Sequence, residues 1–319
     1  MDYSTLFMIL GFLAAAYAIV ANDAIQTLGT FISSNGKRPW WVLWMFSCTI
    51  LGLVLVYGWF AYNGDVSYGR LGTKFPVPDT FTWVHAIPPF LIIILTRYGI
   101  PVSTTFLVLT VFAPTVLSKI LMKSALGYLV AFVSGLIVYL LVSKIIESKF
   151  IKTNKEEVPS RWVVFQWIST GFLWSQWLIQ DLANIFVYMP TRSLDLQTVL
   201  ISLLVLFGLS GLIFYRRGGE IQGIVNEKTN THDIRSATIV DFIYALILFF
   251  FKNMSDIPMS TTWVFIGLLA GRELGLTLRL NIRPSRGTFK LIFRDAGKAF
   301  VGLAVSVALA LSLPFLQSL

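Results

Sequence analysis

The sequence predicts an all-helical protein that crosses a membrane several times and consists of two related halves. Hydrophobic residues make up 56% of the 319 positions and charged residues only 13%, about half the charged share of a soluble domain. The apolar residues form continuous runs, whereas the strands of a membrane barrel alternate apolar and polar residues. A polar motif of the first half also returns in the second half. These observations predict a polytopic helical fold.

Apolar runs cover most of the chain and mark the expected helices. A helix needs about 20 residues to cross the hydrocarbon core. Some runs reach that length, and others end earlier at Pro, Gly or a charged residue. The runs lie near 4–21, 41–62, 81–96, 104–118, 125–146, 163–179, 197–215, 237–251, 261–271 and 291–317. The first run lacks a basic flank and a clear cleavage site, so we expect a retained helix rather than a signal peptide.

Two polar motifs occur in the same order in both halves. Asn22-Asp23 is answered by Gln180-Asp181, and the stretch 100–105 (IPVSTT) returns at 257–262 (IPMSTT). Asp23 and Ser103 are 80 positions apart in the first half, and Asp181 and Ser260 are 79 positions apart in the second. Chance seldom gives such agreement, so we expect two copies of one unit. The predicted divisions are a first repeat at 1–147, a polar linker at 148–161 and a second repeat at 162–319.

Asp23 and Asp181 lie within strongly apolar sequence and not in an obvious loop. An ionised carboxylate in lipid costs several kcal/mol, so such a residue faces a protein interior or a water-filled cavity. The alternative is an acid that caps a helix or pairs with a Lys near the membrane surface. Because the two acids occupy matched repeat positions, we favour a functional site.

Each Pro-x-Ser-Thr-Thr stretch indicates the start of a helix inside the membrane. Pro is tolerated in a first helical turn, and Ser and Thr are natural caps, so we expect helices to begin at Pro101 and Pro258. A helix N-terminus suits a phosphate or sulfate oxygen, and hydroxyls can donate to the same anion. Alternatively, these residues only cap helices or pack between them. The hydroxyl residues are Ser103, Thr104, Thr105, Ser260, Thr261 and Thr262.

An anion beside two carboxylates is repelled strongly in a low-dielectric site. Sodium ions or protons bound at Asp23 and Asp181 would neutralise the acids and couple anion uptake to cation movement. Discontinuous helices that meet near the midplane are usual in secondary transporters built from two repeats. If each repeat crosses the membrane an odd number of times, the repeats are inverted, and rocking one part against another gives alternating access.

The paired motifs resemble the inorganic phosphate transporter (PiT) family of cation-coupled permeases. The repeat of that family reads Gly-Ala-Asn-Asp-x-x-Asn, followed by Gly-x-Pro-Val-Ser-Thr-Thr, and residues 99–105 (GIPVSTT) fit the second element closely. This chain departs from the pattern, because Gln26 and Gln180 each replace one Asn and Asp256 replaces a Gly. The resemblance spans both halves and is that of a divergent member.

This resemblance implies two inverted repeats with broken or re-entrant helical hairpins around a central site. It also implies coupled transport of a small inorganic oxyanion, with phosphate the first expectation and sodium or protons as the co-transported cation. The implied partners are the oxyanion, the lipid bilayer and a second copy in a homodimer, with no bound cofactor and no metal beyond sodium. The implied anion contacts are the six hydroxyl residues with Asn22 and Gln180, and the implied cation contacts are Asp23, Asp181, Gln26 and Asn184.

Other classes stay open on the sequence alone. A permease for sulfate or another oxyanion, an anion channel without tight cation coupling, and a transport-silent relative acting as sensor or subunit would share these residues. An enzyme is disfavoured, because the sequence contains no His/Asp/Glu cluster at metal-ligand spacing and no Walker loop or Gly-x-Ser-x-Gly elbow. His85 and Asp241 are further candidates as gates or proton carriers. The better expectation places His85 at the membrane interface and Asp241 in a buried polar network.

The net charge of +9 would suggest nucleic acid in a soluble protein. In a membrane protein it indicates basic loops that set the topology and face anionic lipid. The stretch 279–298 is the best candidate for a cytoplasmic segment. We therefore expect no nucleic-acid partner and a place in the plasma (inner) membrane.

Overall fold

The chain folds as an integral, multi-pass membrane protein made of helices. The computed structural model describes residues 2–72, 74–98, 102–142, 159–219, 222, 233–280 and 285–317, and no strand occurs within these ranges. In this part of the chain, six helices are long and apolar enough to cross a membrane. The prediction of an all-helical polytopic fold is therefore confirmed.

The helices of the first half begin with α1 (Tyr3–Ala21) and α2 (Asp23–Ser34), which are interrupted at Asn22. The long helix α3 (Trp40–Ala61) follows, and the loop 62–82 leads to α4 (Trp83–Arg97). A π-helical turn, η1 (Thr105–Leu109), continues into α5 (Thr110–Phe112), and a 3₁₀ turn, η2 (Pro114–Val116), precedes α6 (Leu117–Val142).

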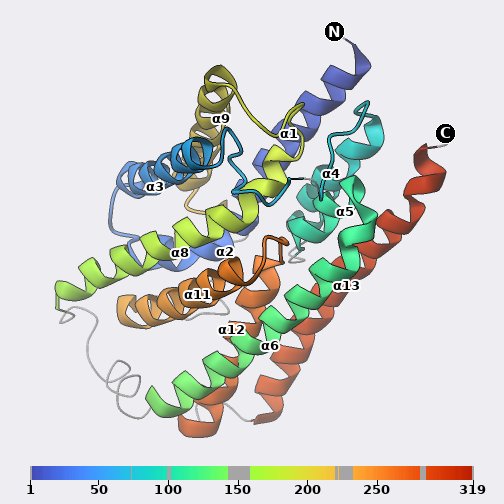
Figure 1. The fold of residues 1–319 in the computed structure, drawn as a ribbon. Helices are drawn as coiled ribbons and strands as arrows, with labels where there is room; N and C mark the ends of the chain where they lie inside the picture. The colour runs from blue at the N-terminus through green and yellow to red at the C-terminus, as the bar shows by residue number, and fades with distance from the viewer. Residues whose placement is uncertain are drawn as a thin grey trace.

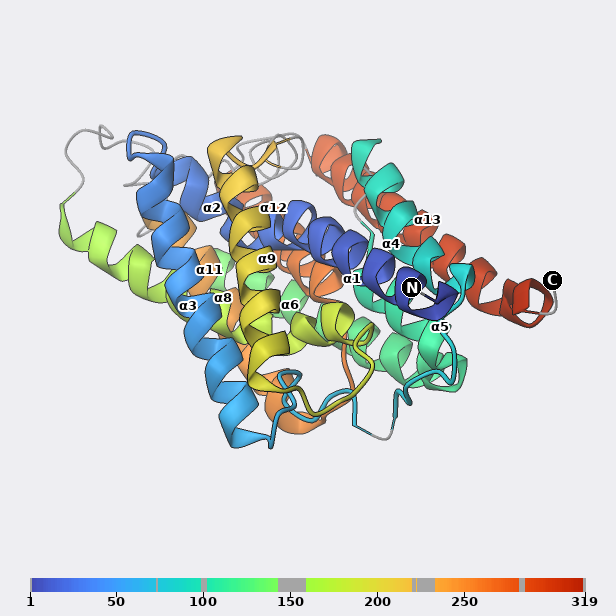
Figure 2. The same cartoon turned by 90° about the horizontal axis from the view of Figure 1, so that it is seen from above.

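The helices of the second half follow one another in a comparable order, with α8 in the place of α1 and α2. This half contains α8 (Arg161–Phe186), α9 (Leu196–Tyr215), α11 (Ile234–Met254), α12 (Thr261–Leu280) and α13 (Ser285–Gln317). Unlike α1 and α2, α8 continues without a break through its Asp motif. The start of α1 and the end of α13 lie on the same side of the molecule (Figures 1 and 2).

Corresponding helices of the two halves pack in corresponding ways. Helix α1 packs on α4 as α8 packs on α11, and α1 contacts α9 as α8 contacts α3 (Figure 1). Helix α12 lies along α6, while η1 and α5 contact α13. This pairing is what two copies of one unit would give. The repeat boundaries at 147 and 162 and the inversion of the repeats stay predictions.

The structure corrects three details of the expected helices. Helix α2 falls outside the apolar runs, because its sequence is largely polar or small. The run at 104–118 is split at Ala113, whose backbone is not helical (φ −150°, ψ 80°). Helix α12 begins at Thr261 and not at Pro258. Ser260 occupies the N-cap position, because its Oγ accepts from Trp263 N at 3.2 Å, and an N-cap residue directly precedes the first helical residue. Pro101 lies outside the described residues.

Helices α6 and α12 approach closely along a row of glycines in α12. A Cβ added to Gly267 would lie 2.4 Å from the Tyr128 carbonyl oxygen, and one added to Gly271 would lie 2.0 Å from the Phe132 carbonyl oxygen. Small residues spaced four apart let helix backbones pack together in membranes. The glycine row therefore fixes α12, whose first turn carries Thr261 and Thr262, against α6.

Candidate functional site

The predicted site residues meet in the interior, where α1, α2, η1, α8 and α12 come together. Each of them is at most 6% exposed, and each lies at or near the end of an apolar run. Helices α8 and α12 are not among the six most apolar spans, and their burial lets them carry polar residues. The site residues are Asn22, Asp23, Gln26, Ser103, Thr104, Thr105, Gln180, Asp181, Asn184, Ser260, Thr261 and Thr262.

Asp23 lies at the interruption between α1 and α2 and accepts hydrogen bonds at both carboxylate oxygens. Thr104 donates to Oδ2 at 2.5 Å. Asn22 donates to Oδ1 at 2.8 Å, and Gln26 and Thr262 approach the same oxygen at 3.5 Å. Thr262 comes from the second half, so residues of both halves hold this one carboxylate.

Asp181 occupies the matching place on α8 but is less completely bonded. Its Oδ1 accepts a hydrogen bond from Asn184 Nδ2 at 2.8 Å, and the Thr105 and Thr261 hydroxyls lie near the carboxylate. Among the described residues, Oδ2 of Asp181, Oδ1 of Asn184 and Oε1 of Gln180 are buried and accept no hydrogen bond. Residues three and four apart share a helix face, so these three oxygens belong to one face of α8.

The two hydroxyl triplets make matching contacts across the halves. Thr105 donates to the Met259 carbonyl at 3.3 Å, and Thr262 donates to the Val102 carbonyl at 3.4 Å. Each donor and its acceptor come from opposite halves, and the two acceptors occupy equivalent positions. Asn184 adds donated bonds to Thr104 at 3.3 Å and Thr105 at 3.2 Å. The structure thus brings both acids and both triplets to one place.

The serines of the triplets cap their helices. Ser103 Oγ accepts from Phe106 N at 3.3 Å, and Ser260 Oγ accepts from Trp263 N at 3.2 Å. The aromatic rings of Phe106 and Trp263 then meet edge to face, with 5.4 Å between centroids. Capping uses each serine as an acceptor, and its hydroxyl hydrogen is still available for donation to an anion.

Two other residues singled out from the sequence lie apart from this cluster. His85 is buried within the protein, and its Nδ1 accepts from Thr82 N at 3.0 Å at the start of α4. Its place at the membrane interface stays a prediction. Asp241 lies in a buried polar network, as the sequence analysis predicted. Its two oxygens accept from Thr30 at 2.7 Å and from Thr170 at 2.6 Å, which ties α2, α8 and α11 together.

Sequence reasoning missed Arg70, which reaches the site from the loop 62–82. The side chain is 2% exposed and donates from Nε to the Ile179 carbonyl at 2.8 Å, directly before the Gln180-Asp181 motif. Burial lowers the pKa of Arg70 to about 10, while the nearby Asp256 and Asp181 carboxylates act in the opposite direction. The guanidinium is therefore charged at neutral pH. A single Arg in a polar loop gave no signal in the sequence.

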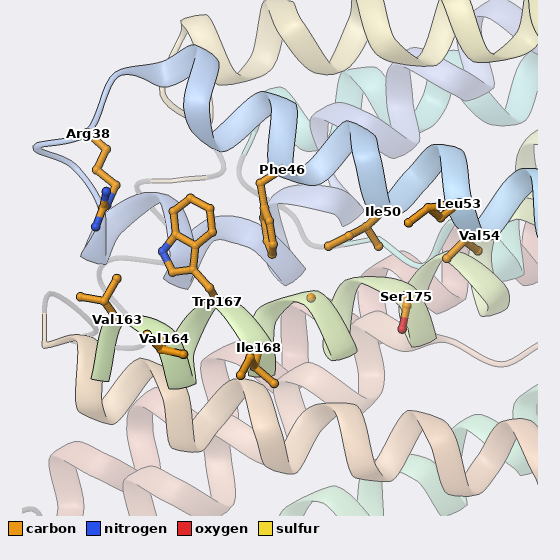
Figure 3. Close-up of a pocket in the computed structure, with 11 residues that line it drawn as sticks. Arg38, Phe46, Ile50, Leu53, Val54, Val163, Val164, Trp167, Ile168 and Ser175 are labelled. Carbon is orange, nitrogen blue, oxygen red and sulfur yellow. The ribbon is translucent and has the colours of Figure 1, made fainter. Parts of the chain in front are cut away.

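A wide groove on the protein does not coincide with the buried cluster. A groove of about 750 Å³ runs between α3 and α8, lined mainly by apolar residues with Arg38 at one end (Figure 3). It contains none of the predicted site residues. By contrast, a cavity that touches Asp181 has a volume of only about 10 Å³, about what a single water needs. This conformation is therefore closed around Asp181.

Comparison with known proteins shows which solved structure has a similar fold. No family model matches the chain, and no curated protein matches it. The chain is similar to a solved structure described as "The sodium-dependent phosphate transporter", with a TM-score of 0.65 and 18% sequence identity. The match covers 100% of this chain and 99% of that one. At this identity the likeness concerns the fold, which the two chains share over their full length.

Proposed function

We propose that the chain is a secondary active transporter that moves a small inorganic oxyanion, phosphate in the first instance, together with sodium or protons. The observation that carries the proposal is the convergence of two acids and two hydroxyl triplets, from opposite halves, in one buried cluster. The full-length likeness to a protein described as a sodium-dependent phosphate transporter supports the same class. By this proposal the chain transports and does not catalyse.

The oxyanion is held by hydroxyl and amide hydrogens rather than by a dense set of cations. Thr104, Thr105, Thr261 and Thr262 line the junction of the halves, and Ser103 and Ser260 each have a hydrogen to donate. Asn22, between α1 and α2, and Gln180, on α8, contribute amide groups. A tetrahedral oxyanion accepts many hydrogen bonds, and donors from both halves satisfy several of its oxygens at once.

The cation binds beside Asp181. Hard cations take oxygen ligands, and buried oxygens without hydrogen-bond donors are costly unless a ligand completes them. Oxygens of Asp181, Asn184 and Gln180 meet both conditions on one face of α8. The Asp23 oxygens, by contrast, already accept hydrogen bonds. We therefore place the first cation at Asp181 and Asn184, with Gln180 as an added ligand, and give Asp23 and Gln26 the task of holding the hydroxyls.

Alternating access explains why the cluster is closed. A cavity of about 10 Å³ at Asp181 admits no oxyanion, so transport requires one part of the protein to move. Because contacts such as Thr262 to Asp23 cross between the halves, movement of one half against the other would open the cluster. The plasma (inner) membrane, the inverted arrangement and a homodimer belong to the same proposal.

The decisive experiment reconstitutes the purified protein into liposomes and measures uptake of labelled phosphate and sulfate. Imposed sodium and proton gradients are compared with no gradient. Uptake that requires one gradient supports coupled transport and identifies the cation. Equal flux without any gradient would identify a channel, and failure to bind or move either anion would leave only a non-transporting role.

A double substitution tests the hydroxyl residues. Ser103→Ala with Ser260→Ala removes two donors and two caps, so the apparent affinity for the oxyanion should fall and the folded protein should be somewhat less stable. An apparent affinity equal to that of the wild type would exclude these serines from the anion site.

A further inference from the structure

We propose that Arg70 binds the transported oxyanion outside the hydroxyl cluster and determines which anions the protein accepts. The inference rests on the oxyanion transport proposed above and adds a residue to it. Arg70 comes from the loop 62–82, which carries none of the repeated motifs.

The geometry of Arg70 leaves one hydrogen-bond donor without a partner. Nε donates to the Ile179 carbonyl at 2.8 Å, whereas Nη1 is buried and has no acceptor among the residues that the structure describes. A buried charged donor without an acceptor is unfavourable, and hydrogen bonds to charged groups are stronger than neutral ones. An oxygen of a passing oxyanion would supply the missing acceptor next to Asp181.

The loop holds Arg70 in this place. Asp65 accepts from Ser67 N at 2.7 Å and from Gly69 N at 3.1 Å, which closes a tight turn before Arg70. Gly69 has φ +74°, a conformation that favours glycine. The Tyr68 hydroxyl donates to the Val54 carbonyl at 2.5 Å and fastens the turn to α3. Arg70 is therefore presented by an ordered turn, as a selecting residue requires.

The charge around Arg70 favours an anion. Arg70 interacts electrostatically with Asp256, Lys123 and Lys252. Lys123 also interacts with Lys74. Lys123 is held by the carbonyls of Ser255 at 2.8 Å and Ile257 at 2.7 Å, and Lys252 lies over the Tyr68 ring at 6.0 Å. Four basic side chains thus lie near two carboxylates, Asp256 and Asp181, and an excess of positive charge raises the local concentration of anions.

The guanidinium group suits a tetrahedral oxyanion in particular. Its planar fork offers several donors in fixed directions, which match phosphate or sulfate better than a spherical halide. The segment 255–260, whose carbonyls accept from Lys123, leads directly into α12 and its hydroxyls. An oxyanion bound at Arg70 would therefore lie near basic groups that contact the approach to the buried cluster.

A second arginine provides a matched control. Arg192, in the loop after α8, also lies near the loop 62–82 and also donates to backbone carbonyls. Nε and Nη2 bond Phe75 O, and Nη1 bonds Val187 O at 3.0 Å. All three nitrogens of Arg192 are used within the protein, so its role is structural. In Figure 2 the loops that carry the two arginines lie along the same side of the molecule.

The test measures labelled phosphate uptake against phosphate concentration in proteoliposomes that contain the full chain. Arg70→Gln should raise KM by about tenfold or more, with a much smaller change in maximal rate. Arg192→Gln should lower the yield of folded protein or its Tm and leave KM unchanged. Discrimination between phosphate and chloride, measured by competition, should weaken in Arg70→Gln alone.

The outcomes separate this inference from the proposed function. If the Arg70→Gln variant takes up phosphate with the same KM as the wild type, the role of Arg70 is overturned and the transporter proposal is left intact. A wild-type protein that moves no oxyanion would overturn both. If Arg70→Gln does not fold, Arg70→Lys decides, because it keeps the charge but replaces the planar fork with a single ammonium nitrogen. A KM several-fold above wild type then supports the proposal, and a wild-type KM overturns it.

Discussion

Thr104 donates its hydroxyl hydrogen to Asp23 over 2.5 Å, although the two residues lie 81 positions apart. The same hydroxyl oxygen accepts from Asn184 Nδ2 at 3.3 Å, and Asn184 in turn donates to Asp181 at 2.8 Å. One threonine thus connects the acids of the two halves. Any change in the charge of Asp23 or Asp181 is therefore felt by hydroxyls that line the proposed anion site.

Asp23→Asn should abolish coupled uptake while the protein is still made and folded. The substitution removes the negative charge, and the single amide oxygen cannot accept from both Thr104 and Asn22. Uptake of labelled phosphate into proteoliposomes should fall to background, and circular dichroism should be unchanged. Asp79→Asn serves as the control, because Asp79 is exposed in the loop 62–82. Normal uptake by Asp23→Asn would remove Asp23 from the mechanism.

Asn184→Ala should weaken the affinity for the coupling cation more than the affinity for phosphate. The change deletes one of the three unsatisfied oxygens on α8 and the donor to Asp181. The sodium concentration for half-maximal uptake should rise by about tenfold, the loss expected for one good ligand or charged hydrogen bond. The measurement is a sodium titration at saturating phosphate, repeated as a pH titration if protons prove to be the cation.

Gln26→Ala is the informative comparison for the cation site. Gln26 donates to Asn22 Oδ1 at 3.3 Å and approaches Asp23 Oδ1 at 3.5 Å, so it supports the hydrogen bonds around Asp23. We expect a smaller rise in the half-maximal sodium concentration than for Asn184→Ala. The reverse order would move the cation from Asp181 to Asp23.

The sequence alone was sufficient to predict the helices that face lipid and to identify the paired motifs. Long apolar runs predicted α1, α3 and α9 almost to the residue, because a helix in lipid must be apolar along its length. Asp23, Asp181 and the hydroxyl triplets stood out because polar residues in such runs are costly. What they do in the mechanism still rests on the experiments above.

Features that depend on tertiary packing could not be predicted in this way. Helix α2 is buried by its neighbours, so its polar sequence carries no apolar run. The start of α12 depends on Ser260 and on Lys123, which holds the carbonyls before it. Arg70 becomes a site residue only because its loop folds against α8. In each case the deciding contact joins residues far apart in sequence.

Asp241→Asn should lower stability and leave the apparent affinities for phosphate and cation unchanged. Both Asp241 oxygens accept short hydrogen bonds from Thr30 and Thr170, and a neutral amide would weaken them. The cost should be about 1–3 kcal/mol, visible as a lower Tm in detergent. Thr170→Val should reproduce part of the loss. A change in the pH dependence of uptake in Asp241→Asn would instead indicate a proton carrier.

Gly271→Ala should destabilise the protein through the contact between α6 and α12. The added Cβ would lie 2.0 Å from the Phe132 carbonyl oxygen, so the two helices must move apart. Overpacking of this kind costs about 1–3 kcal/mol. Gly208→Ala on α9 is the matched control, because a Cβ there meets nothing within 4 Å, and it should be neutral or slightly stabilising. Thermal unfolding of both variants in the same detergent checks this.

Because α12 carries Thr261 and Thr262 at its first turn, any Gly271→Ala protein that still folds should also show a raised KM for phosphate. Equal Tm values for the two variants would mean that α6 and α12 are not in the close contact described.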